Sequence, residues 1–226
     1  MTVTPSTKTD GQLRTDVHNE LKWDPNVDEN EVGITVARGI VTLTGTVSAY
    51  PKKLAAIEAA HRVYGVLDVV DDLTVRIPSV WERTDHDIAA AVRHALQWDV
   101  LVPDDRITST VSGGHVTLQG AVDTWTQRWN AENAVQRITG VKGVINQITV
   151  QACTADPTAI KRQIEEAVAR QTEREIKRLG VAVRDGVVTL TGTLRSWAER
   201  NAVERAATYA PGVRRVDDRT TVDPCQ

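Results

Sequence analysis

The sequence is short of several residue types, and each shortage excludes a class of protein. Of its 226 residues only two are cysteine, Cys153 and Cys225, which is too few for the disulfide framework of a secreted domain. No run approaches the ~20 apolar residues that cross a membrane. The N-terminal segment also has no apolar stretch of the kind that a secretion signal contains. These absences predict a cytoplasmic protein.

Aromatic residues and an excess of positive charge are missing as well. The chain has no phenylalanine, six tryptophans and three tyrosines, so aliphatic residues and alanine must supply most of its core. Its formal net charge is −3, which argues against general nucleic-acid binding, because that needs clustered lysine and arginine. The 41% hydrophobic and 25% charged residues otherwise describe an ordinary globular protein.

What the sequence does contain is one segment present three times. The run Gly39-Ile-Val-Thr-Leu-Thr-Gly45 returns as Gly114-His-Val-Thr-Leu-Gln-Gly120 and as Gly186-Val-Val-Thr-Leu-Thr-Gly192, at offsets of 75 and then 72 residues. A later Gly-Val pair, beginning at Gly65, keeps both offsets, so the copies align without a gap. We predict a disordered N-terminus over residues 1–9 and three modules over 10–78, 84–152 and 157–223.

Each module has the same pattern of apolar residues. A spacing of four predicts a first helix, whose stripes are Leu13, Val17 and Leu21, then Ile88, Val92 and Leu96, then Ile160, Ile164 and Val168. Alternating residues such as Val32, Ile34 and Val36 predict two strands, and a stripe of small residues predicts a second helix. A third strand follows. The fold class is therefore α+β: three tandem αββαβ modules, each a three-stranded mixed sheet with two helices on one face.

Glycines punctuate every copy, and we interpret them as structural. The hairpin turns end at Gly39, Gly114 and Gly186, where a positive φ is required. Gly45, Gly120 and Gly192 lie on the inward face of the second strand, where the missing side chain is expected to let a helix approach closely. Gly65, Gly140 and Gly212 are expected to end the second helix from the C′ position.

The V-T-L-x-G strand, the helix after it and the G-V-x-x-V segment before a closing strand together resemble the BON domain, named after bacterial osmotically inducible and nodulation proteins. The resemblance covers nearly the whole chain, three times over. The chain is similar to three-module members of that family that have no signal peptide. The resemblance implies the αββαβ fold, no enzymatic activity, and roles in envelope and osmotic stress with phospholipid association.

A search for chemical sites finds no candidate. The five histidines have no metal-ligand spacing and do not recur between modules, so we expect no metal. Neither a nucleophile elbow nor a phosphate-binding or dinucleotide loop is present. Cys153 and Cys225 are 72 residues apart, the module offset itself, and we attribute them to duplication rather than to a redox pair. We predict a protein that is not an enzyme and uses no cofactor.

Aromatic residues at repeated positions are the first candidate binding feature. Tyr50, Trp125 and Trp197 begin the second helix of the three modules, and Trp23 and Trp98 end the first helix of two of them. The favoured interpretation is that these rings close the edges of small cores. The alternative is that some are exposed anchors for a lipid interface or a partner protein.

Charge is the second candidate feature. Residues 10–78 hold seven basic and eleven acidic side chains, whereas residues 157–223 hold thirteen and ten, so the third module is the cationic end of an acidic chain. A basic surface beside Trp197 would suit anionic headgroups. The candidate residues of this surface are Arg170, Arg174, Lys177, Arg178, Arg200, Arg214 and Arg215.

Two hypotheses follow for function. In the first, the protein binds anionic phospholipid or an envelope-associated partner during stress, lying in the cytoplasm or peripherally on the membrane. In the second, it is a soluble scaffold whose modules bind partner proteins or one another, with the basic third module against the acidic first one.

Overall fold

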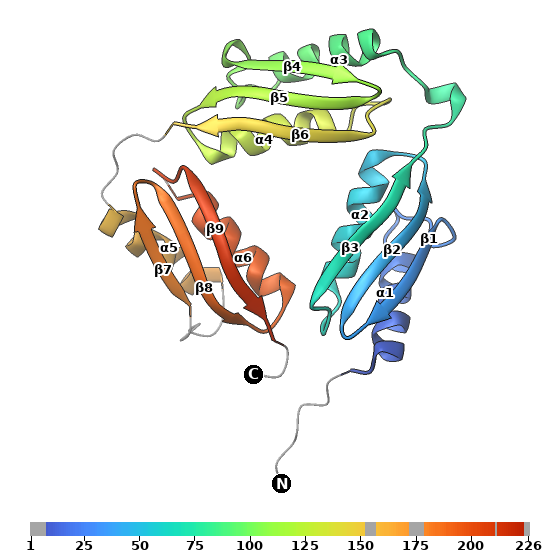
Figure 1. Ribbon diagram of the computed structural model, residues 1–226. Helices are drawn as coiled ribbons and strands as arrows, with labels where there is room; N and C mark the ends of the chain where they lie inside the picture. Colours follow the sequence, from blue (N-terminus) through green and yellow to red (C-terminus); the bar gives the residue numbers. More distant parts are fainter. Residues whose placement is uncertain (1–7, 152–156, 172–178, 211, 224–226) are drawn as a thin grey trace.

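The computed structural model describes residues 8–151, 157–171, 179–210 and 212–223 and divides them into three like modules (Figure 1). Module one contains α1 (Asp10–Trp23), β1 (Val32–Ala37), β2 (Ile40–Val47), α2 (Tyr50–Arg62) and β3 (Asp68–Val75). After a short 3-10 helix, η1 (Ser79–Trp81), module two contains α3 (Asp85–Trp98), η2 (Asp104–Arg106), β4 (Ile107–Ser112), β5 (His115–Val122), α4 (Trp125–Gln136) and β6 (Gly143–Val150). Module three contains α5 (Pro157–Gln171), β7 (Gly180–Arg184), β8 (Val187–Leu194), α6 (Trp197–Thr208) and β9 (Arg215–Val222).

Every module has one three-stranded mixed sheet with its second strand in the centre. The first two strands form an antiparallel hairpin, and the third strand pairs parallel to the second because the second helix crosses over between them. The register repeats between modules, so that Val41 pairs with Val69 and Val116 pairs with Val144. The predicted α+β fold with αββαβ modules is confirmed.

Both helices of a module pack on one face of its sheet, and the predicted stripes form the contact. Leu13, Val17 and Leu21 of α1 are buried with Ala56 and Ala60 of α2 in one core, and the aligned positions whose side chains are described are buried in the other two modules. Thr9 and Thr84 cap α1 and α3 through capping boxes with Gln12 and Asp87. Capping satisfies backbone amides that the first helical turn leaves without partners.

The hairpin turns carry an additional restraint in two modules. Arg38 and Gly39 have φ values of 54° and 77°, as a tight hairpin turn requires. The Asp10 carboxylate, at the start of α1, accepts hydrogen bonds from both of their backbone amides at 2.9 and 3.0 Å. Asp85 holds Gly113 and Gly114 in the same way at 2.8 and 2.9 Å. The aligned position in module three is Pro157, which has no carboxylate to offer that hairpin.

The expectation that Gly45, Gly120 and Gly192 let a helix approach is wrong for the two glycines whose surroundings are described. A Cβ atom on Gly45 would lie 2.2 Å from the carbonyl oxygen of Glu31, and one on Gly120 would lie 2.2 Å from that of Arg106. Those carbonyls precede the first strand. The glycine therefore makes room for the backbone that enters the hairpin, and Gly192 shares the positive φ, at 131°.

The expectation that Gly65, Gly140 and Gly212 occupy the C′ position is also wrong. The helices end earlier, with caps at Val63, Arg137 and Tyr209. Each glycine instead has a positive φ at the third position of a turn closed by a backbone hydrogen bond, such as Val66 N to Val63 O at 3.3 Å. That geometry is typical of a type II turn and leads the chain into the third strand.

The three modules lie around a common centre, and module three returns beside module one (Figure 1). The third strand of each sheet, β3, β6 and β9, lies on the inner side, and the first strand lies on the outer side. Contacts between α2 and α6 join the first and last modules directly. The chain is therefore a closed arrangement rather than an extended string of modules.

Candidate functional site

Trp197 of module three closes the arrangement by packing on module one. Its ring stacks on His61 of α2, with the ring centroids 4.1 Å apart and the planes inclined by 9°. Its indole N–H donates a hydrogen bond of 3.2 Å to the carbonyl oxygen of Leu67. Burial lowers the pKa of His61, and the positive charge of Arg200 acts in the same direction although Asp68 opposes it. The contact therefore favours a neutral imidazole.

The aligned aromatic residues of the other modules also lie at junctions. Tyr50 of module one packs against the hydrophobic core of module two, and burial raises the pKa of its phenol. Trp125 of module two lines one cavity together with Thr208 and Tyr209 of module three. Thr208 is the aligned counterpart of His61. Each aromatic at the start of a second helix thus faces the next module in a cycle of one to two, two to three and three to one.

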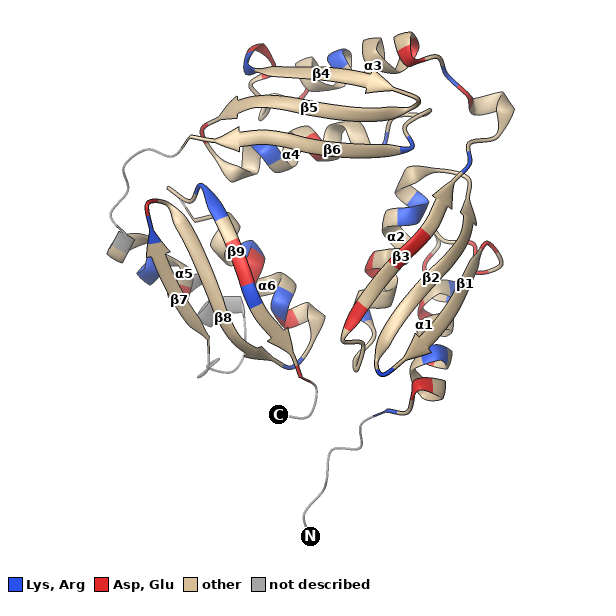
Figure 2. Cartoon of the chain, viewed as in Figure 1, with Lys and Arg blue, Asp and Glu red and all other residues tan. Residues whose placement is uncertain are grey.

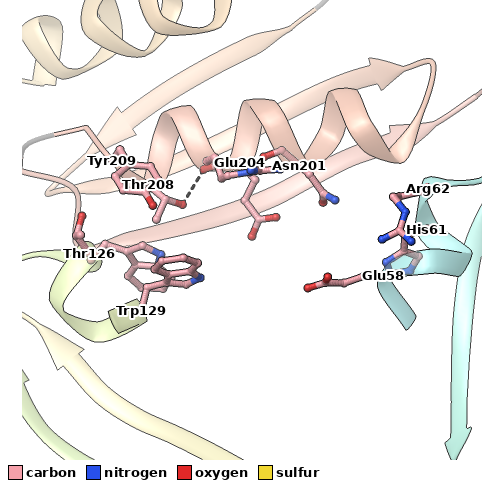
Figure 3. Close-up of a pocket in the computed structure, with 11 residues that line it drawn as sticks. Glu58, His61, Arg62, Thr126, Trp129, Asn201, Glu204, Thr208 and Tyr209 are labelled. Atoms are coloured by element: carbon pink, nitrogen blue, oxygen red, sulfur yellow. Dashed lines mark hydrogen bonds between the residues drawn. The ribbon is translucent and has the colours of Figure 1, made fainter. Parts of the chain in front are cut away.

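These junctions border a partly open cavity of about 470 Å³ between the three modules, here called the central cavity (Figure 3). Its volume lies within the range of ~300–1,000 Å³ that is usual for ligand sites. All three second helices contribute to its lining. The lining residues are Glu58, His61 and Arg62 from α2, Trp125, Thr126 and Trp129 from α4, and Asn201, Glu204, Arg205, Thr208 and Tyr209 in or directly after α6.

Most of the positive charge near the central cavity is already compensated. Arg62 pairs with Glu20 at 2.7 Å and with Asp24 at 2.8 Å. By contrast, the Glu58 and Glu204 carboxylates accept no hydrogen bond and form no ion pair within the described parts of the chain. Burial and the nearby Asp218 raise the pKa of Glu204, although Arg200 opposes them.

A wider groove of about 1180 Å³ lies between α2 and α4 and shares Glu58 and Trp129 with the central cavity. Amide side chains line much of its α4 side: Asn130, Asn133 and Gln136. Amides both donate and accept hydrogen bonds, as a peptide backbone does. The groove and the central cavity are therefore continuous, with amide side chains in the groove and aromatic rings and carboxylates in the cavity.

The aromatic residues that the sequence singled out fall into two groups. Trp23 and Trp98 are 84% and 75% exposed, so the interpretation that they close small cores is wrong for them. The indole N–H of Trp98 donates a hydrogen bond to His94 on the same helix. Tyr50, Trp125 and Trp197 are only partly exposed and lie at module junctions, a location that neither the core nor the anchor interpretation anticipated.

The basic residues of module three do not gather into one patch in the part that is described. Arg200 pairs with Asp218 at 2.7 Å and stacks on Trp197 at 4.5 Å, so it serves the fold. Arg214 and Arg215 are exposed at the start of β9, where acidic and basic residues intersperse along the strand (Figure 2). Arg174, Lys177 and Arg178, the side chain of Arg170, and both cysteines lie outside the described residues. Their predicted binding role stays a prediction.

Sequence reasoning missed most of the central cavity. Trp129 follows Trp125 by one helical turn, which was the available signal that α4 presents a second aromatic on one side. Nothing in the pattern marks Glu58, Glu204 or Tyr209, because they are polar-face residues that meet only when the modules close. No three histidine, cysteine or acidic side chains converge on a metal-binding arrangement within the described ranges.

Comparison with known proteins identifies the repeated unit. The family model described as "BON domain" matches residues 9–77, 84–152 and 156–224. The chain belongs to the BON domain family. BON domains are linked to phospholipid binding and stress-related roles, and this family assignment points to a non-enzymatic protein. Among the residues described for this BON protein, no helix has the length and apolarity to cross a membrane.

Other comparisons add little to the BON assignment. The search of curated proteins finds no match. One similar solved structure is CdsD, a structural protein of the type III secretion system of Chlamydia trachomatis, at 15% identity and a TM-score of 0.26, covering 94% of this chain and 92% of that one. The C-terminal domain of CdsD matches at 15% identity and a TM-score of 0.25, covering 96% of this chain and all of that one.

Proposed function

We propose that the protein is a non-enzymatic binding scaffold whose three BON modules act as one unit and hold a partner protein at the surface they share. The central cavity is the observation that carries this proposal. Its lining comes from the second helices of all three modules, so no single module forms it. A binding surface of this kind exists only while the junctions, and above all the Trp197 contact, stay closed.

Crosslinking and affinity purification from cells at native expression tests the scaffold. The bait would be the full chain, the variant Trp197→Ala, or the control Trp23→Ala, which removes an exposed ring outside the junctions. We expect a partner that the wild type and the control both recover. Recovery with Trp197→Ala should fall about tenfold, as for a loss of ~1.4 kcal/mol of binding free energy. A partner recovered equally with all three baits would overturn the proposal that the modules act together.

Phospholipid association is the second candidate, and an exposed apolar turn favours it. Trp98, Val100 and Leu101, at the end of α3 and just after it, are 75%, 97% and 63% exposed. Large apolar side chains with this exposure are accepted by a lipid interface, and tryptophan is enriched there. The family link between BON domains and phospholipid points the same way.

Co-sedimentation with vesicles separates the two candidates. Zwitterionic vesicles are compared with vesicles that contain phosphatidylglycerol or cardiolipin, at low and moderate salt. Binding that requires anionic lipid and weakens with Arg214→Glu/Arg215→Glu would support a cationic contact, whereas binding lost with Val100→Asp would place the apolar turn at the interface. An absence of sedimentation at every salt concentration would remove the lipid candidate.

A further inference from the structure

The two carboxylates of the central cavity come from opposite sides of the Trp197 junction. Glu58 extends from α2 and Glu204 from α6, and both point into the space beside Trp129 (Figure 3). The cations of the neighbouring helical turns are engaged elsewhere, since Arg62 is held by Glu20 and Asp24 and Arg200 is held by Asp218. Of the basic residues that line the cavity, Arg205 remains, and its Nε–H donates to the Asn201 carbonyl at 3.4 Å. With Arg62 engaged by other carboxylates, two acidic side chains of the lining stand against the one cation Arg205, so the lining keeps a small excess of negative charge.

Aromatic rings border the same space. Trp129 and Tyr209 are 51% and 52% exposed, and Trp125 completes the aromatic part of the lining. Part of the Trp125 ring is already covered by the Arg128 guanidinium, 4.3 Å from the ring centroid, which shows how these rings accept a cation. A guanidinium or ammonium over a tryptophan face is attracted by the negative face of the ring, and more strongly where water is excluded.

We propose that the central cavity receives the arginine or lysine side chain of a partner protein, between Glu58 and Glu204 and against Trp129 and Tyr209. This inference rests on the proposed scaffold function and names the chemistry of its partner. An anionic headgroup would meet two carboxylates and only one cation, Arg205, without a carboxylate partner among the described residues, so the cavity favours a cationic ligand over an anionic one.

A protein segment is favoured over a free amine because of the groove beside the cavity. The groove shares Glu58 and Trp129 with the cavity and continues along α2 and α4. Asn130, Asn133 and Gln136 line it with amides that match the hydrogen-bonding groups of an extended backbone. The partner's backbone lies in this groove while its cationic side chain enters the cavity.

The raised pKa of Glu204 is consistent with this arrangement. Burial and the nearby negative charge of Asp218 make ionisation of the Glu204 carboxyl unfavourable. A bound cation stabilises the ionised carboxylate and offsets this free-energy cost. Binding of the cationic side chain should therefore weaken as the pH falls and Glu204 becomes protonated, at a higher pH than for an ordinary glutamate.

Titration of the full chain with capped pentapeptides tests the inference. The probes are acetyl-Gly-Ala-X-Ala-Gly-amide with X as arginine, lysine, citrulline or glutamate, followed by the shifts of the tryptophan indole N–H signals. We expect arginine and lysine to bind at least about tenfold more tightly than citrulline, which matches arginine in shape but has no charge. Glutamate should not bind.

Variants assign the effect to the cavity. Glu58→Gln/Glu204→Gln should abolish the preference for arginine over citrulline, whereas the control Glu166→Gln, on an exposed face of α5, should retain it. Three results would each overturn the proposal that the cavity receives a cationic side chain. They are equal binding of the arginine and citrulline peptides, no binding at millimolar concentration, and a preference for arginine that survives the double substitution. The scaffold proposal has a separate test, because it fails only if the Trp197→Ala variant recovers as much partner protein as the wild type does.

Discussion

Single carboxylates determine much of how the modules are built. Asp10 and Asp85 each join the start of a first helix to a hairpin turn through two backbone amides. The hydrogen bonds that Asp85 accepts from the Gly113 and Gly114 amides lower its pKa, and those that Asp10 accepts from the Gly39 and Arg38 amides lower the pKa of Asp10. The ionised carboxylate is therefore the form that the fold stabilises.

Asp85→Asn should lower the urea midpoint of the protein at pH 7, because an amide oxygen is a weaker acceptor than a carboxylate. A folded-state pKa below the unfolded value of ~3.9 means that the contribution is complete above that value and is lost as the pH falls through the folded pKa. Urea unfolding at pH 7 and near pH 2.5 measures this, with the exposed Asp72→Asn as the control. A midpoint difference that persists at the lower pH would contradict the role of the charge.

Glu204 predicts the opposite sign. Its pKa is raised, so its contribution to stability is complete below the ordinary glutamate pKa and is lost as the pH rises through the folded-state value. Glu204→Gln should therefore raise the urea midpoint at pH 7 and leave it unchanged near pH 4. The matched Glu166→Gln, which removes an exposed contact to Arg162 of 3.8 Å, should not raise it. A variant less stable than the wild type at pH 7 would show that the carboxylate is satisfied in the fold.

At the scale of elements, one bridge ties the second helix to the third strand in every module. The fourth residue of the second helix meets a polar residue of the strand: Lys53 pairs with Asp71 at 2.8 Å, Arg200 with Asp218 at 2.7 Å, and Arg128 with the Asn146 carbonyl at 3.0 Å. The strand residue in turn accepts the amide two residues later, as Asp218 does from Thr220. Burial disfavours the charge of Asp218, but the bonds from Thr220 and Arg200 outweigh it and lower its pKa.

Arg200→Ala should destabilise module three by about 1–2 kcal/mol, since it leaves a partly buried carboxylate without its cation while solvent still screens part of the charge. The lowered pKa of Asp218 means that this loss is complete above ~pH 4 and shrinks as the pH falls below it. Arg219→Ala is the control, because its pair with Asp217 is exposed and its guanidinium side chain is 68% accessible. Equal effects of the two substitutions in urea unfolding would refute the bridge.

The elements themselves were predictable because their signals are local. The stripes of α1, α3 and α5, the hairpin glycines and the capping residues act within a few positions of one another. The roles of Gly45 and Gly65 were not, because each depends on which backbone segment passes nearby after folding. Trp197 was the least predictable, since the carbonyl that it contacts, that of Leu67, is 130 residues away in the chain.

For the whole molecule, we expect Trp197 to be the contact that keeps the array closed. The Trp197 ring stacks on His61, and its indole N–H donates to the Leu67 carbonyl, so part of a large ring is removed from water. This burial stabilises the closed form by about 2 kcal/mol, which corresponds to a factor of roughly 30 in the ratio of closed to open molecules. Trp197→Ala should therefore enlarge the radius of gyration in small-angle scattering while circular dichroism stays constant, because the cores are separate. Trp23→Ala should change neither. Unchanged scattering from Trp197→Ala would show that other junctions suffice.

The order of the junctions has a consequence for how many modules such a chain can contain. Each module presents an aromatic residue at the start of its second helix and a receiving surface at the end of that helix, and the two ends differ, so the contact has a direction. Three steps of one direction return to the start only when each turns the chain by a third of a revolution on average. In an array of two such modules, one aromatic residue and one receiving surface would have no partner. A fourth module added to a closed array of three would find every aromatic residue and every receiving surface already in contact. Within this array the three directed contacts use each of the three aromatic residues and each of the three receiving surfaces, and we expect the removal of one module to leave one of each free for contact with a second copy.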